Sequence, residues 1–289
     1  MIRFGTCSWK YDSWRGLVYS DDKNINYLKE YSAQFNTVEI DQWFWSLFPP
    51  NKVKLPDKKV VEEYAESVPE DFLFTIKVPN SLTLTHFYNR NKNAPLIENP
   101  YFLSNELFDE FLETLNPLKD KIGCLMFQFE YLNKQKMNSL SKFETAFRNF
   151  HSNISAGSPP IAIEIRNPNY LKESFFEFLQ SLKLYFVFLE GYYMPSIIDT
   201  YSKFQNFIKD LTIIRLHGPD RKGIEKLAKD DWSRIIVNRD DKIKAIAEMI
   251  AELNSREVDI FINVNNHFEG SAPLTIKRIK DKLQLSNNI

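Results

Sequence analysis

One pattern recurs along the whole chain: a short apolar or β-branched run, then a polar loop, then a stretch with helical periodicity. The runs lie at residues 2–6, 37–41, 72–78, 122–129, 161–166, 184–189, 212–217 and 258–263. Such alternation is typical of parallel βαβ units. Most of the runs are almost continuously apolar, as expected for strands with helices on one side and a packed interior on the other.

Helical stripes fill most of the gaps between these runs. Apolar residues spaced i, i+3, i+4 and i+7 form one buried helix face. The clearest stripe comprises Ile243, Ile246, Ala247, Ile250 and Leu253, and further stripes lie within residues 60–68, 103–115 and 140–150. We interpret all of them as core packing between helices and strands.

Eight such units in one chain favour a closed barrel over an open, doubly wound sheet. An open sheet often carries a GxGxxG fingerprint after its first strand, and none is present here. The 289 residues are a common size for one such barrel, and no linker divides them. The prediction is an α/β protein, a (β/α)8 TIM barrel with a parallel eight-stranded barrel and outer helices, forming a single domain over residues 1–289.

Composition excludes several classes of function. The formal net charge of -1 provides no global field that would draw the chain onto nucleic acid or an anionic membrane. The longest apolar stretches, such as 184–189, are far too short to span a bilayer. The two cysteines, Cys7 and Cys124, cannot form a disulfide framework. We therefore expect a cytoplasmic protein with a small-molecule ligand and no membrane partner, and nucleic acid stays an alternative that the charge disfavours.

Polar side chains gather at the C-terminal ends of the predicted strands. Successive strand residues alternate faces, so residues two apart point the same way. The set comprises Glu39, Asp41, Lys77, Gln128, Glu164, Arg166, Arg215, His217, Asn263 and Asn265. In a (β/α)8 barrel this end carries the active site. The alternative is a purely structural role, in which Glu164 forms a buried ion pair with Arg166 or Arg215 and fills the top of the barrel.

The residue types suggest roles. Glu164 and His217 are the best acid–base candidates, with Glu39 as a third catalytic candidate. Lys77, Arg166 and Arg215 can hold a carboxylate or phosphate. The remaining expected ligand contacts are Gln128, Asn263 and Asn265 on the strands, and Trp9 and Trp43 in the first two loops. The working hypothesis is an enzyme that acts by acid–base chemistry on a small anionic or phosphorylated substrate.

Two other readings stay open. Glu39, Asp41, Glu164 and His217 could converge on one divalent metal as the cofactor of a hydrolase or a nucleic-acid-processing enzyme, although three basic side chains would share that pocket. Alternatively, the pocket could sense a metabolite without turnover, with the long loop 79–102 as a lid.

A set of short motifs resembles a known family. The motifs are GTCSW (5–9), FNTVEI (35–40), FQF (127–129), EIR (164–166), RLHG (215–218) and NNHFEG (265–270). In this order they are similar to the YecE-like family, domain of unknown function 72, from residue 3 to about residue 275. The chain departs from the family at Asp41, where an Asn is usual. The resemblance implies a (β/α)8 barrel and supplies no reaction.

Overall fold

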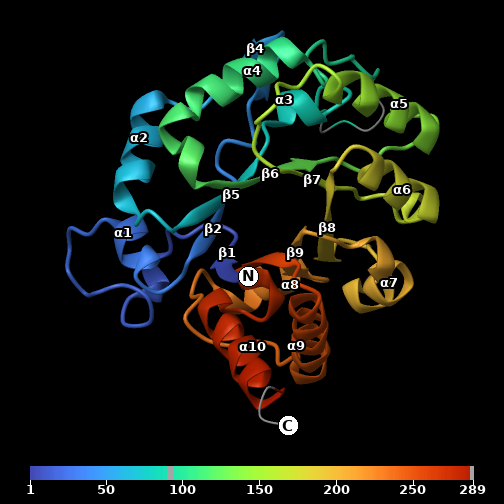
Figure 1. Ribbon diagram of the computed structural model, residues 1–289. Coiled ribbons are helices and arrows are strands. Elements are labelled where there is room, and N and C mark those ends of the chain that lie inside the picture. The colour runs from blue at the N-terminus through green and yellow to red at the C-terminus, as the bar shows by residue number, and fades with distance from the viewer. Residues whose placement is uncertain (90, 92–93, 287–289) are drawn as a thin grey trace.

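Eight parallel strands surround a common interior in the computed structural model, which describes residues 1–89, 91 and 94–286 (Figure 1). The strands are β1 (Ile2–Thr6), β2 (Thr37–Ile40), β5 (Leu73–Lys77), β6 (Ile122–Gln128), β7 (Ile161–Glu164), β8 (Tyr185–Gly191), β9 (Leu211–Gly218) and β10 (Asp259–Val264). Their order in the sheet is β1-β10-β9-β8-β7-β6-β5-β2. The predicted (β/α)8 barrel is therefore confirmed. A small antiparallel pair, β3 (Leu47–Phe48) and β4 (Lys52–Val53), lies outside it and was not predicted.

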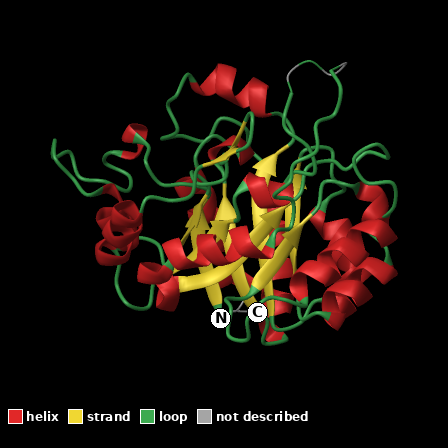
Figure 2. Ribbon diagram, turned by 90° about the horizontal axis from the view of Figure 1, so that it is seen from above, coloured by secondary structure: helices red, strands yellow, loops and turns green. Residues whose placement is uncertain are grey.

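Helices form the outer layer around the strands (Figure 2). They are α1 (Tyr27–Ser32), α2 (Lys58–Ser67), α3 (Asn80–Thr83), α4 (Asn105–Thr114), α5 (Leu140–His151), α6 (Glu173–Ser181), α7 (Ile197–Phe204), α8 (Arg221–Ala228), α9 (Asp240–Ser255) and α10 (Ala272–Ser286). The apolar stripe predicted for residues 243–253 is the buried face of α9. In the part of the chain described, no helix is long and apolar enough to cross a membrane.

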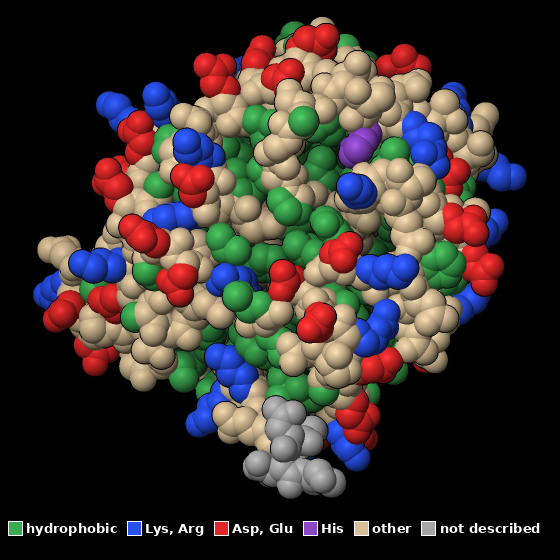
Figure 3. All heavy atoms as spheres, in the orientation of Figure 1, with side chains coloured by type: hydrophobic (Ala, Val, Ile, Leu, Met, Phe, Trp, Pro, Cys, Tyr) green, Lys and Arg blue, Asp and Glu red, His purple; other side chains and the backbone are tan. Residues whose placement is uncertain are grey.

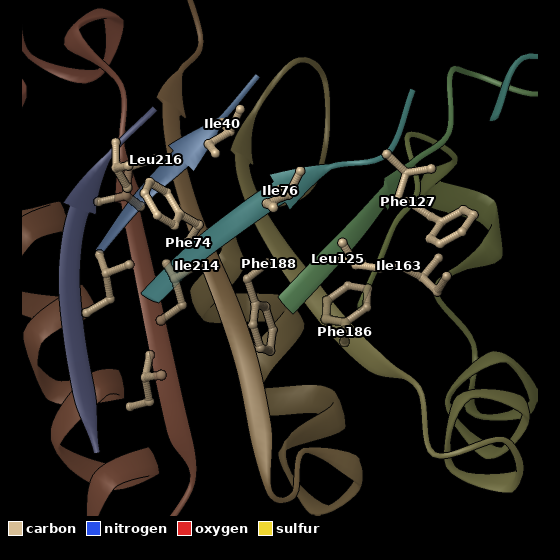
Figure 4. Packing of buried hydrophobic residues seen from close by; sticks show 14 of the residues in the cluster. Ile40, Phe74, Ile76, Leu125, Phe127, Ile163, Phe186, Phe188, Ile214 and Leu216 are labelled. Carbon is tan, nitrogen blue, oxygen red and sulfur yellow. The ribbon is translucent and has the colours of Figure 1, made fainter. Parts of the chain in front are cut away.

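The alternation of strand side chains divides the core into two parts. The outward residues, such as Phe74, Ile163 and Phe186, pack under the helices in one large cluster (Figure 4). The inward residues form a smaller cluster inside the barrel, made of Cys124, Met126, Ala162, Val187, Ile213 and Phe261. The inward positions beyond this apolar floor, toward the C-terminal strand ends, carry the polar side chains described below.

The seam between β1 and β2 is closed by a side chain as well as by backbone. The two strands share an isolated bridge between Cys7 and Glu39 rather than a regular ladder. The Tyr31 hydroxyl, from α1, accepts the Thr6 N–H at 2.8 Å and donates to the Thr37 carbonyl at 3.1 Å. Tyr31 therefore satisfies backbone groups that a continuous ladder would otherwise pair.

The loop that the sequence analysis treated as a lid has an anchored base. Residues 80–86 are buried and include α3. The Asn99 amide donates to the Ser81 carbonyl at 2.7 Å and to the Leu84 carbonyl at 2.6 Å. Residues 90, 92 and 93 of this loop lie outside the described residues. The anchored part belongs to the barrel core, so lid motion of the whole 79–102 segment does not fit the structure.

The barrel seam generates a stability prediction. Tyr31→Phe removes the hydroxyl and leaves a buried N–H and a buried carbonyl without their partner, which should lower the free energy of unfolding by about 1–3 kcal/mol. Urea unfolding measures this loss. Tyr101→Phe is the matched control, because the Tyr101 hydroxyl bonds the Asn51 carbonyl at an exposed position; its loss should stay within about 0.5 kcal/mol. Equal losses in the two variants would contradict the role given to Tyr31.

Candidate functional site at the barrel mouth

Strand register brings the predicted polar residues into one layer. Glu39 pairs with Thr75 across β2 and β5, and Asn263 pairs with Arg215 across β10 and β9. Gln128 and Glu164 pair in the same way across β6 and β7. These residues come from strands all around the barrel and point into it. Five of the strand-end polar residues singled out in the sequence therefore lie in one layer: Glu39, Gln128, Glu164, Arg215 and Asn263.

Arg215 lies at the centre of this layer. Its Nε and Nη2 atoms donate to the two carboxylate oxygens of Glu39, both at 2.7 Å. Its Nη1 atom donates to the Glu164 carboxylate and, at 3.3 Å, to the Gln128 side-chain carbonyl. Arg215 is 1% exposed and both glutamates are fully buried. Because its donors are engaged by protein acceptors, Arg215 does not present a free guanidinium to a ligand.

Arg166 completes the charge balance of the layer. Its Nε atom lies 3.2 Å from the second carboxylate oxygen of Glu164. Burial alone would raise the pKa of Glu164, but Arg215 and Arg166 outweigh it and hold that pKa below its usual range. A carboxylate gripped by two guanidiniums is a poor proton carrier near neutral pH. The contacts of Glu164, and of Glu39, are those of anchors for arginine, whereas the sequence analysis expected both to be catalytic.

The two asparagines play different parts. The Asn263 amide donates to the Thr75 hydroxyl at 2.8 Å and to Glu39 at 3.4 Å, so it belongs to the buried layer. The Asn265 side chain instead accepts the His267 N–H at 2.9 Å and caps the short helix Asn266–Phe268. Capping accounts for the Asn265 side chain without a ligand.

His217 sits above the layer between two partners. Its Nε2 atom is 3.6 Å from the Cys7 sulfur, and its Nδ1 atom is 3.1 Å from the Tyr192 hydroxyl. Burial, together with the positive charges of Arg215 and Arg166, holds the pKa of His217 well below its usual range. The imidazole is therefore neutral at pH 7; it is a weak base, and once protonated it releases its proton readily.

Tyr192 is a site residue that the sequence analysis missed. It follows β8 with a positive φ of 53°, and the Arg166 guanidinium lies 4.5 Å above its ring. A pocket of about 690 Å³ opens beside this stacked pair. Its lining residues are Glu130, Tyr131, Arg166, Pro168, Asn169, Tyr192 and Tyr193. The signal was present in the sequence as the Gly191-Tyr192-Tyr193 turn at the end of the sixth barrel strand.

Lys77 and Asp41 lie at the same end of the barrel. Lys77 is 8% exposed, and its Nζ atom is 3.9 Å from the centre of the Phe44 ring. Burial and the nearby Arg215 charge lower the pKa of Lys77. Burial and the Glu39 charge raise the pKa of Asp41 to about 6. Both groups therefore sit in an environment that disfavours their charged forms.

The two expected aromatic ligand contacts have other partners. Trp9 meets Tyr64 of α2 edge-on at 5.1 Å between ring centres, and Trp43 stacks on the same ring at 5.7 Å. Trp9 also lines an outer groove of about 720 Å³ beside α1 and α2. Sequence spacing placed both residues in the right loops but could not show which way their rings turn. Phe44 and Tyr192 are two aromatic residues that do contact mouth residues, Phe44 beside Lys77 and Tyr192 beside His217.

The metal alternative does not fit the donor set. Within the described residues, no group of three or more His, Cys, Asp or Glu side chains could hold a metal ion. Of the four proposed ligands, Glu39 and Glu164 already bind Arg215, and positive charge surrounds His217. A divalent cation would have to displace a buried guanidinium to reach them.

These features define an α/β-barrel protein with a closed ionic layer and an open pocket above it. The family model described as "Protein of unknown function DUF72" matches residues 3–289, so the chain belongs to this family. The resemblance drawn from the motifs is thereby confirmed. No curated protein was found to match the chain.

Solved structures of the same family share the fold. A DUF72 family protein from Enterococcus faecalis has 20% sequence identity and a TM-score of 0.67, over 98% of this chain and 96% of that chain. A DUF72 family protein from Thermotoga maritima has 21% identity and a TM-score of 0.65, over 98% of this chain and 99% of that chain. At this identity the likeness supports the fold alone.

Asp41 generates a pH prediction. An aspartate titrates near pH 4 in an unfolded chain, and Asp41 titrates at about 6 in the fold. The folded state therefore binds this proton more tightly than the unfolded state, and protonation of Asp41 stabilises the fold. This contribution to the free energy of unfolding is fully present below about pH 4 and is lost as pH rises through about 6. Asp41→Asn lacks this effect. Urea unfolding at several pH values gives the free energy of unfolding of the wild type and of Asp41→Asn. The wild-type value minus the variant value should fall as pH rises over this window. A flat or rising difference would contradict the raised pKa of Asp41.

Proposed function

We propose that this protein is an enzyme that acts on a small anionic substrate at the barrel mouth. Arg166 binds the negative charge, and the His217–Tyr192 pair moves a proton. One observation carries the proposal: the Arg166 guanidinium lies in the pocket wall, bound to Glu164 through Nε and stacked on Tyr192. Among the described residues its two Nη atoms have no hydrogen-bond partner.

Arg166 is preorganised for an anion. Glu164 fixes one edge of the guanidinium and the Tyr192 ring supports one face, so little side-chain freedom is left to lose on binding. The free Nη edge can grip a carboxylate or phosphate through two parallel hydrogen bonds. Since Arg215 is engaged by carboxylates, the anion-holding role assigned to both arginines from the sequence falls to Arg166 in our proposal.

The proton-transfer pair borders the same pocket. Tyr192 lines the pocket, and its hydroxyl contacts the Nδ1 atom of His217. Burial raises the pKa of Tyr192, so its hydroxyl keeps its proton at pH 7. A neutral imidazole behind a protonated phenol can take up or return a proton through the hydroxyl. His217 therefore keeps its expected catalytic role, and Tyr192 replaces Glu164 as its partner.

Two alternatives to this enzyme are a nucleic-acid-processing protein and a metabolite-binding protein without turnover. Acidic and basic side chains are interspersed on the face shown in Figure 3, with no continuous basic surface there for nucleic acid. A metabolite-binding protein without turnover would use the same pocket, and only turnover on a substrate separates it from an enzyme.

The cytoplasm remains the proposed location, because both cysteines are free and buried.

The anion-binding role of Arg166 can be tested without a known substrate. Phosphate and small carboxylates should raise the thermal unfolding midpoint of the wild-type protein, because they bind only the folded state. Arg166→Gln should lose most of that rise. Arg148→Gln is the matched control, since Arg148 also lies over an aromatic ring, Phe178, but on the exposed side of α5. An undiminished rise in Arg166→Gln would refute the proposal.

A further inference from the structure

Lys77 differs from every other charged side chain of the buried layer. Arg215, Glu39 and Glu164 pair with one another, and Arg166 joins them. Lys77 is 8% exposed, and among the described residues its Nζ atom has no hydrogen-bond or ion-pair partner. This atom lies over the face of the Phe44 ring.

An ammonium group in this position is poorly stabilised. The two fully buried carboxylates that could neutralise it are already bound to Arg215. A ring face at 3.9 Å recovers only part of the hydration that burial removes. The position of Lys77 at the end of β5 keeps it at the mouth, where its field reaches Asp41 and His217. An unpaired, desolvated amine beside another cation is the standard environment of a nucleophilic lysine.

We propose that Lys77 is the nucleophile of the site and forms an imine with the carbonyl group of an aldehyde or ketone substrate that also carries an anionic group. This inference deepens the proposed function and rests on it, because Arg166 would hold the anionic group. It also changes the role of Lys77, which the sequence analysis expected to hold negative charge. The lowered pKa of Lys77 agrees with the geometry, because it raises the fraction of neutral amine at pH 7.

The chemical step is balanced without a further reagent. The Nζ lone pair attacks the carbonyl carbon, the carbonyl π electrons move to oxygen, and one proton passes from nitrogen to that oxygen to give a carbinolamine. A second proton reaches the oxygen, the carbon–oxygen bond breaks, and water leaves as nitrogen forms the double bond and then releases its remaining proton. The net change is amine plus carbonyl to imine plus water. Asp41, with its pKa of about 6, is suited to give and recover these protons.

Reductive trapping on the wild-type protein tests the inference. The protein is incubated at pH 7 with glyoxylate and cyanoborohydride, which reduces an imine to a stable amine, and labelled lysines are mapped by peptide mass spectrometry. Formaldehyde replaces glyoxylate in a parallel arm, since it offers a carbonyl without an anion. Lys280 is the internal control, because it is half-buried on α10, lies over the Phe4 ring and has a pKa lowered by burial.

The expected result is that glyoxylate labels Lys77 clearly faster than Lys280, because Lys77 is more deeply enclosed and lies beside Arg215. Arg166→Gln should slow the glyoxylate reaction and leave the formaldehyde reaction unchanged, and Lys77→Arg should carry no label at that position. If Lys77 reacts equally with glyoxylate in wild type and Arg166→Gln, the imine inference survives and the anion-binding proposal fails. If Lys77 reacts no faster than Lys280 with either carbonyl, the imine inference is overturned, whatever Arg166 does.

Discussion

The buried guanidinium of Arg215, held between Glu39 and Glu164, is the interaction on which the mouth of this barrel depends. It joins β9 to β2 and β7 through the barrel interior. Removing three charges from water is expensive, and their mutual attraction offsets that cost only because the bonds are short and the geometry is bidentate. Loss of any one partner would leave a buried charge uncompensated. The network therefore fixes which side chains at the mouth are engaged and which are free.

The division between engaged and free groups links the fold to the proposed chemistry. Glu164 uses its second oxygen to position Arg166, so the ionic layer also orients the group that faces the pocket. The positive charge of Arg215 helps to keep His217 neutral and lowers the pKa of Lys77. In our proposal, the ion network therefore sets the electrostatics of the groups that lie above it at the mouth.

The fold was predictable from the sequence because both of its periodicities are local. Strand side chains alternate between two faces, and apolar helix residues recur every three or four positions. These two patterns predicted the barrel and the polar residues at its strand ends. The partners of those polar residues depend on strand order and register, which no local pattern contains. The sequence predicted an ion pair of Glu164 with Arg166 or with Arg215 and could not show that Glu164 contacts both. Tyr31 and Tyr192 were missed because a helix residue bridging two strands and a tyrosine in a left-handed turn carry no periodic signal. Trp9 and Trp43 were expected at the ligand because their loops follow strand ends. The direction of their rings depends on tertiary contacts with Tyr64, which the sequence does not show.

The central claim is that Arg215 is engaged within the layer while Arg166 is open to an anion. The most direct measurement is a nuclear magnetic resonance titration of protein carrying ¹⁵N-labelled arginine, following the Nε–H signals as phosphate and then glyoxylate are added. The Arg215 signal should show slow hydrogen exchange and should not move, whereas the Arg166 signal should shift to saturation. A saturable shift of Arg215, or a stationary Arg166 signal with every anion, would contradict the division of the site described here.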